Sequence, residues 1–145
     1  MKRGKPLTRK GPLRSQSRGK RLRKSKILDP RPDISEQRET VYDRAGGHCD
    51  LCGQPLSWSS FQCHHRKKRS QGGDDSLPNL MALHGSCHHD RVHARPKWAY
   101  DRGFMVRRDD DPAKTAVLRH GTRWQVPGED QWEGADAPAG WGAAA

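Results

Sequence analysis

Two short stretches decide the fold: Cys49-Asp50-Leu51-Cys52 and His84-Gly85-Ser86-Cys87. Each places two metal-ligating side chains three positions apart, so that both can bind one ion from a tight turn. If the two turns meet, they offer zinc four ligands in a tetrahedral arrangement. The spacing therefore predicts a structural Zn²⁺ site. Its expected ligands are Cys49, Cys52, His84 and Cys87, and the alternatives to His84 are His48 and Cys63.

The composition also favours a domain braced by metal. The chain has 145 residues, enough for one domain, but only 31% of them are hydrophobic, against roughly 45–50% in typical globular proteins. A core this small usually needs a metal, disulfides or a partner, because burial barely offsets conformational entropy. Since no export signal is evident, the four cysteines favour metal ligation over disulfides.

The sequence predicts a helix, then a strand, a long loop, a second strand and a second helix. Gly46-Gly47 ends the first helix, and Gly72-Gly73 with Pro78 exclude regular structure from the loop. Residues 48–93, which follow the first helix, hold seven of the eight histidines and all four cysteines. The expected elements are a helix over 36–45 capped by Ser35, a strand over 58–66, a loop over 67–79, a strand over 80–83 and a helix from Ser86 to Ala94.

Three stretches resemble the signature of the HNH nucleases. They are His64-His65-Arg66, the segment from Gly72 through Asn79 to Leu80, and Leu83-His84-x-x-Cys87-His88. The likeness covers about residues 36–103 and is greatest to the small HNH proteins of tailed bacteriophages, which often carry a similarly basic leader. It implies a ββα-metal core, in which a β-hairpin and a helix surround a catalytic divalent ion.

The resemblance also implies roles for individual residues. His65 would be the general base, while His64, which stands where many members have Asp, and His88 would bind the catalytic ion. Asn79 would tie the loop backbone together and so hold the strand that bears His65. Because imidazole suits transition ions better than it suits Mg²⁺, the histidine at position 64 leaves the ion open among Mg²⁺, Mn²⁺ and another transition ion.

Two further sets of residues are candidates for the site. His93 is a possible third ligand of the catalytic ion, but on an ideal α-helix it shares a face with His89, whereas His88 lies about 140° away. The spacing leaves ligation and a structural role for His93 both open. The basic side chains that follow His65 are expected to line the substrate side and contact phosphates. They are Arg66, Lys67, Lys68 and Arg69.

The excess positive charge is confined to the first 33 residues. They hold thirteen Lys and Arg against two Asp, whereas the other 112 residues hold fifteen basic and fifteen acidic side chains. Such a polycation attracts phosphate backbones. No apolar run approaches the roughly 18 residues of a membrane span, and the leader lacks the apolar segment of a signal peptide. We therefore expect a soluble cytoplasmic protein, in the host cell if a phage encodes it, with no membrane partner.

The predicted fold class is α+β, with a ββα-metal core and a structural zinc. The expected segments are a disordered basic nucleic-acid-binding tail over 1–33, an HNH nuclease core over 34–103, a C-terminal β-hairpin extension over 104–127 and a disordered tail over 128–145.

The predicted function is hydrolysis of DNA phosphodiester bonds, by nicking or double-strand cleavage. Low sequence specificity is expected because no recognition helix with several base-reading side chains is evident. The resemblance implies 5′-phosphate and 3′-hydroxyl products, and it suggests terminase or other phage packaging proteins as partners. The main alternative is a non-catalytic zinc-finger module that binds nucleic acid. Such a module needs one zinc and has no reason to place an imidazole pair opposite His88.

Overall fold

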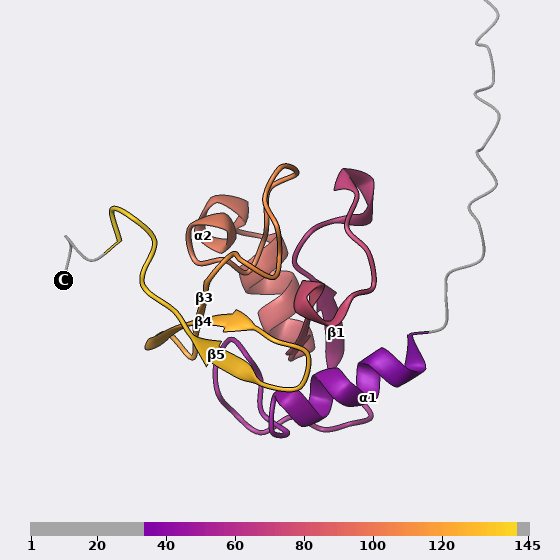
Figure 1. Ribbon diagram of the computed structural model, residues 1–145. Coiled ribbons are helices and arrows are strands. Elements are labelled where there is room, and N and C mark those ends of the chain that lie inside the picture. The colour runs from indigo at the N-terminus through magenta and orange to yellow at the C-terminus, as the bar shows by residue number, and fades with distance from the viewer. Residues whose placement is uncertain (1–33, 142–145) are drawn as a thin grey trace, which may run out of the picture. The chain divides into compact units, whose positions relative to one another are not determined.

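The computed structural model describes residues 34–141 (Figure 1). The predicted basic tail, residues 1–33, and the last four residues of the predicted C-terminal tail lie outside the described residues. The first element is the helix α1 (Ser35–Arg44), which agrees with the expected 36–45 to within one residue. Ile34 occupies its N-cap position, and not Ser35 as expected. No helix among residues 34–141 is long and apolar enough to cross a membrane.

A two-stranded antiparallel hairpin follows, formed by β1 (Gln62–His65) and β2 (Leu80–Leu83). Its register pairs His64 with Met81 and His65 with Leu80. β2 has the predicted bounds and is buried throughout. β1 is shorter than the predicted 58–66, because the amides of Ser60 and Phe61 both bond back to the Ser57 carbonyl and form a turn there.

The loop between the two strands contains two single turns of 3₁₀-helix, η1 (Arg69–Gln71) and η2 (Leu77–Asn79). Gly73 lets the loop fold tightly, because a Cβ at this position would lie 1.9 Å from the Lys67 carbonyl oxygen. No residue other than glycine fits there without moving the backbone. The loop therefore returns against the start of its own path.

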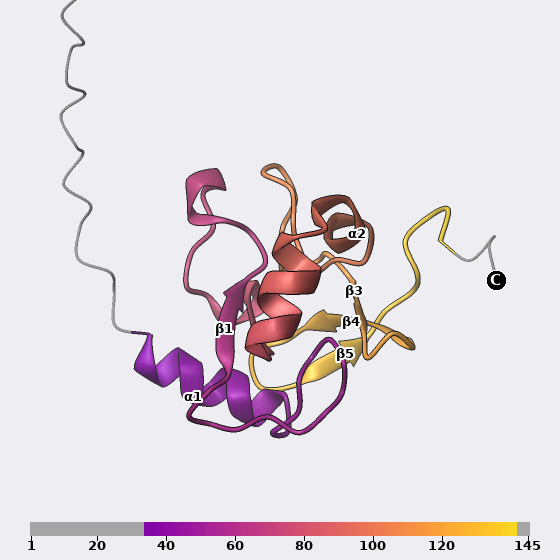
Figure 2. The same cartoon turned by 180° about the vertical axis from the view of Figure 1, so that it is seen from behind.

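Next comes the segment η3 (Cys87–His93), followed by the helix α2 (Pro96–Asp101). η3 was expected to be an α-helix, but it is a π-helix, in which the amide of each residue bonds to the carbonyl five positions earlier. The bond from the Ala94 amide to the His89 carbonyl, 3.1 Å long, has this spacing. Seen from behind, η3 lies beside β1 (Figure 2).

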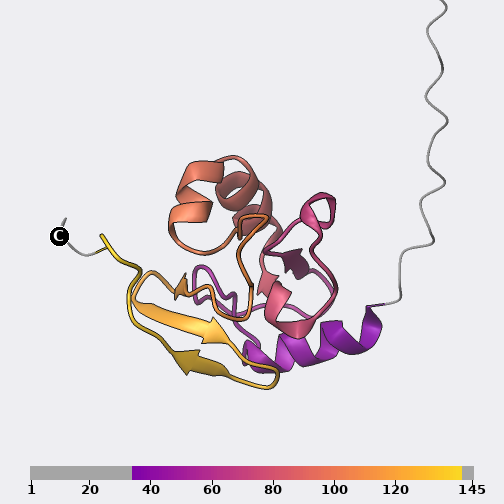
Figure 3. The same ribbon diagram turned by 45° about the horizontal axis from the view of Figure 1, so that its top comes forward.

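The C-terminal part forms a three-stranded antiparallel sheet in the order β3-β4-β5 (Figure 3). The predicted hairpin over 104–127 is present as β3 (Val117–Arg119) and β4 (Arg123–Pro127). The prediction of a disordered segment after residue 128 is wrong for β5 (Trp132–Gly134), which pairs with β4. Trp132 anchors this strand, because its ring lies 4.9 Å from the guanidinium of Arg44 and 4.6 Å from that of Arg119.

One hydrophobic core joins these elements. It contains Val41 of α1, all four residues of β2, Val92 of η3 and Val117 of β3. Phe104 and Met105, from the segment predicted as a separate extension, also lie in it. A buried ion pair of 2.8 Å between Arg119 Nε and Asp50 Oδ1 adds a polar link from β3 to the first Cys/His turn. The mixed α and β fold class is confirmed, and residues 104–119 are part of the same packed body as residues 34–103.

Candidate metal centre and active site

The two Cys/His turns meet in space. The ligand atoms of Cys49, Cys52, His84 and Cys87 all lie within 4.8 Å of one another. Cys52 Sγ is 3.4 Å from His84 Nδ1, and the other ring nitrogen, Nε2, donates to the Pro55 carbonyl over 2.9 Å. This bond leaves Nδ1 free to bind a metal and holds the ring in position. The predicted four-residue cluster is therefore present.

The donor set suits a tetrahedral structural metal. Three sulfurs and one imidazole are ligands that zinc prefers in structural sites. Burial raises the pKa of Cys49, and it raises the pKa of Cys87 to about 12. Without a cation both thiols stay protonated in this environment, because a buried thiolate has nothing to balance its charge. A bound metal would supply that balance.

The two alternative ligands lie outside this cluster. His48 is turned back on its own loop, where its Nδ1 is 2.6 Å from the Gly46 carbonyl oxygen. Cys63 is a half-buried free thiol on β1, and burial raises its pKa to about 11. His84 is therefore the fourth ligand that the fold offers.

A second cluster consists of three imidazoles. The ligand atoms of His64, His88 and His93 also lie within 4.8 Å of one another. His88 Nε2 and His93 Nε2 are 2.9 Å apart. His64 is buried, and its Nε2 donates to the Phe104 carbonyl over 2.8 Å, which leaves Nδ1 as its free ring nitrogen.

The π-helix explains why His93 joins this cluster. On an α-helix, residues five apart point in different directions, but the wider π turn brings them onto one face. His88 and His93 are five apart, so η3 places both rings against His64. The ideal-helix argument, which grouped His93 with His89 and away from His88, is therefore wrong about the local geometry.

All three rings are kept neutral by their surroundings. Burial lowers the pKa of His64 to about 3 and that of His88 to about 4, and it also lowers the pKa of His93. Neutral imidazole is the form that binds a metal. The Nδ1 of His88 is buried and has no hydrogen-bond partner within the described residues. Three imidazoles without a carboxylate fit a transition ion better than Mg²⁺.

His65 lies next to this cluster, and its charge contributes to lowering the pKa of His64. Its Nε2 is 2.6 Å from Oδ1 of Asp75, and its side chain is 22% exposed. Asp75 also accepts from Arg69, whose Nη2 lies 2.7 Å from each carboxylate oxygen. The ring is thus held from one side while part of it faces solvent.

Asn79 holds the loop that carries Asp75. It is fully buried, and its Oδ1 accepts from the Lys67 amide over 2.7 Å. Its Nδ2 donates to the carbonyl oxygens of Lys67 and Asp74, at 3.1 and 2.7 Å. The side chain therefore ties the two ends of the loop together, in the geometry that the sequence comparison implied.

Residues 49–95 match the family model described as HNH endonuclease. This part of the chain is an HNH domain. The match includes both Cys/His turns, the three-imidazole cluster, His65 and Asn79. No curated protein and no solved structure matches the chain.

The basic run of the HNH domain differs from the prediction at two positions. Arg66 is fully buried and does not line the substrate side. Its guanidinium donates to the carbonyl oxygens of Gly103, Pro112 and Thr115, at 2.9, 2.8 and 2.6 Å. Arg69 is at the surface, but its charge is paired with Asp75.

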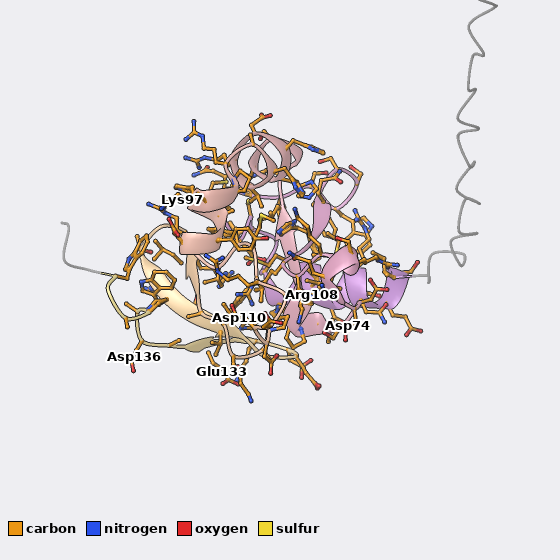
Figure 4. The ribbon with its side chains drawn as sticks, turned by 90° about the horizontal axis from the view of Figure 1, so that it is seen from above. Asp74, Lys97, Arg108, Asp110, Glu133 and Asp136 are labelled. Atoms are coloured by element: carbon orange, nitrogen blue, oxygen red, sulfur yellow. The ribbon has the colours of Figure 1, made fainter. Side chains whose placement is uncertain are left out.

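Lys67 and Lys68 remain available for contacts with a ligand. The Lys67 ammonium donates to the carbonyl of Asp110, which lies on a second loop and is labelled in Figure 4, over 3.1 Å. Lys68 is exposed, and its charge contributes to lowering the pKa of His93. Of the four basic residues, Lys68 is the one that lies exposed beside the imidazole cluster.

Two groups at the site were not predicted from the sequence. The first is Asp75, since the pair Asp74-Asp75 gives no sign of which carboxylate turns inward. The structure directs Asp74 to the amide and hydroxyl of Ser76 and Asp75 to His65. The second is the Phe104 carbonyl behind His64. A backbone oxygen forty residues away leaves no signal in the sequence.

Proposed function

We propose that the protein is a metal-dependent HNH endonuclease that hydrolyses DNA phosphodiester bonds. The observation that carries the proposal is the second metal cluster, formed by His64, His88 and His93, with His65 beside it. A module that only braces its fold with zinc needs the first cluster alone. Stabilising the fold does not require three imidazoles to converge, as they do in the second cluster.

The residues divide the work of phosphodiester hydrolysis. His65 takes a proton from the attacking water, acting as the general base of the reaction. Asn79 holds the loop behind it. A divalent ion bound by His64, His88 and His93 would stabilise the charge that develops on the phosphate and on the leaving oxygen. Lys68, beside the cluster, contacts a flanking phosphate. The products carry 5′-phosphate and 3′-hydroxyl ends.

We expect the protein to cleave DNA with little sequence specificity. A role in phage DNA packaging, with a terminase as partner, is a further part of the proposal. It rests on the likeness to phage proteins and on the basic leader. A partner that raises weak cleavage by the isolated protein would support it.

Two variants test the nuclease proposal. His65→Ala is expected to bind metal and DNA but to cleave supercoiled plasmid about 10²–10⁴-fold more slowly, the usual loss on removing a general base. His88→Ala removes a ligand, so its loss should recover in part at higher ion concentration. The measurement is plasmid cleavage over a series of divalent ions. If His65→Ala cleaves at the wild-type rate, His65 is not the general base. If the wild-type protein cleaves plasmid with none of the ions, the non-catalytic zinc-finger module is the better function.

We also propose that the first cluster holds zinc as a structural ion. Purified protein should contain about one tightly held zinc per chain. Cys49→Ser should unfold the domain or leave it without fixed packing, since metal binding supplies much of the folding free energy in such small domains. Cys63→Ser is the matched control, because Cys63 lies outside the cluster. Protein without zinc that unfolds cooperatively, and does so equally with strong chelators, would contradict this site.

A further inference from the structure

A chain of short contacts joins three side chains of the loop and β1. Asp75 Oδ1 lies 2.6 Å from His65 Nε2, and the Arg69 guanidinium lies 2.7 Å from both oxygens of the same carboxylate. The Asp75 side chain is 17% exposed, against 45% for Arg69. The carboxylate is therefore enclosed between the imidazole and the guanidinium.

The backbone behind Asp75 is also held in place. Asn79 donates to the Asp74 carbonyl over 2.7 Å, one residue before Asp75. Gly73 sits against the Lys67 carbonyl, where a side chain would not fit. Ser76 is bound to the Asp74 side chain through both its amide and its hydroxyl. These contacts fix the backbone on both sides of Asp75.

We infer that Asp75 and Arg69 are positioning residues that orient the His65 ring, an inference that rests on the proposed nuclease function. An ionised carboxylate only accepts hydrogen bonds, so the His65 nitrogen that faces it must carry the proton. This places the hydrogen on Nε2 and the lone pair on Nδ1, the nitrogen that then receives the proton from water. Arg69 donates to both oxygens of Asp75 and so limits the rotation of the carboxylate that faces His65.

A different role for Arg69 is the one expected from the sequence, contact with DNA phosphate. The two roles differ in how the residue couples to Asp75. A phosphate contact acts on substrate binding and is independent of Asp75, whereas a clamp acts only through the carboxylate. A double-mutant cycle separates the two roles, because independent effects add and shared ones do not.

The first measurement follows the His65 ring directly, in metal-loaded full-length protein. Nitrogen-15 NMR of the side chain should find the proton on Nε2 in the wild type and a mixture of tautomers in Asp75→Ala. The readout does not depend on cleavage.

Two exposed residues, Asp109 and Arg108, provide matched controls as Asp109→Ala and Arg108→Gln; Arg108 is labelled in Figure 4. Neither residue forms an ion pair with another residue of 34–141.

The second measurement is the cleavage rate. Asp75→Ala should lower kcat by about 10- to 100-fold, the range typical when a partner behind a functional histidine is lost. The KM for DNA and the affinity for the divalent ion should not change. Arg69→Gln should lower kcat by less, and the double variant should be no slower than Asp75→Ala alone.

The outcomes separate this inference from the nuclease proposal. If the protein cleaves DNA but the His65 tautomer is the same in Asp75→Ala, the positioning role is overturned alone. If Arg69→Gln raises KM and its effect adds to that of Asp75→Ala, Arg69 contacts substrate and is not part of the clamp. A wild-type protein that cleaves no DNA under any divalent ion overturns the nuclease proposal, and the positioning of a base with it.

Discussion

Arg66 has a different role in the fold from the one that its sequence context predicts. By sequence it belongs to a run of four basic side chains after His65, which is typical of phosphate contacts. In the fold it is fully buried and joins β1 to the 103–115 segment through three carbonyl oxygens. Desolvation lowers its pKa to about 9, so the side chain keeps its charge at neutral pH. Its planar fork of donors matches three diverging acceptors, which the single ammonium of a lysine would not reach.

Arg66→Met should therefore destabilise the domain by about 3 kcal/mol or more, because it leaves several buried carbonyl groups without a partner. The free energy of unfolding, measured by chemical denaturation with the metal bound, tests this value. Lys68→Met, an exposed neighbour, should change it by less than about 0.5 kcal/mol. If the Arg66→Met protein is as stable as the wild type but binds DNA more weakly, Arg66 contacts DNA phosphate, as the sequence predicted.

At the scale of the element, the π-helical η3 decides which histidines act together. His88, His89 and His93 all lie on this one short segment. The π turn selects the pair five residues apart and leaves His89 outside the cluster. π-helical turns are rare and are found mostly at functional sites, which agrees with the two imidazoles that η3 contributes to the second cluster.

His93→Ala should weaken binding of a transition ion at the second cluster by at least about 10-fold, because losing even a partner behind a ligand typically costs 10- to 100-fold. His89→Ala, on the same segment, should leave the affinity unchanged. Titration with Co²⁺ followed by its visible absorption distinguishes the two variants. Equal affinities for both would mean that the ion is held by His64 and His88 alone.

At the scale of the whole molecule, the excess positive charge and the candidate active site lie in different parts of the chain. Residues 34–145 carry equal numbers of basic and acidic side chains, and the excess lies in residues 1–33. Residues 34–145 are thus poorly suited to attract DNA from a distance, although they hold the site. Deletion of residues 1–33 should weaken DNA binding strongly and flatten its dependence on salt, while both metal clusters persist.

Cleavage by the truncated protein should survive at low salt, where fewer contacts suffice. DNA affinity measured over a range of salt concentrations, together with metal content, checks each half of this prediction. Unchanged affinity and an unchanged salt slope would show that the leader takes no part in binding, and that DNA is held by residues such as Lys68.

The sequence alone was sufficient to predict the four side chains that converge in the first cluster, the bounds of β2 and the hairpin of β3 and β4. These features depend on short-range geometry: two ligands on one turn, an apolar run of four residues, and a turn centred on His120-Gly121. The positions of His64, His65 and Asn79 followed from their likeness to a known signature. Neighbours within a few residues carry this information, because local backbone geometry sets their spacing.

Only the tertiary structure decided which side chains meet across longer distances. His93 joins the imidazole cluster because η3 is a π-helix, whereas ideal α-helical spacing left its role open. Arg66 turned inward because the 103–115 segment offered it three carbonyl oxygens, and Asp75 turned to His65 while Asp74 bonded to Ser76. The Trp132 ring contacts the guanidinium groups of Arg44 and Arg119. Most of these arrangements depend on a partner that is distant in sequence, and that of His93 depends on the π-helical geometry of η3. Neither can be inferred from local spacing.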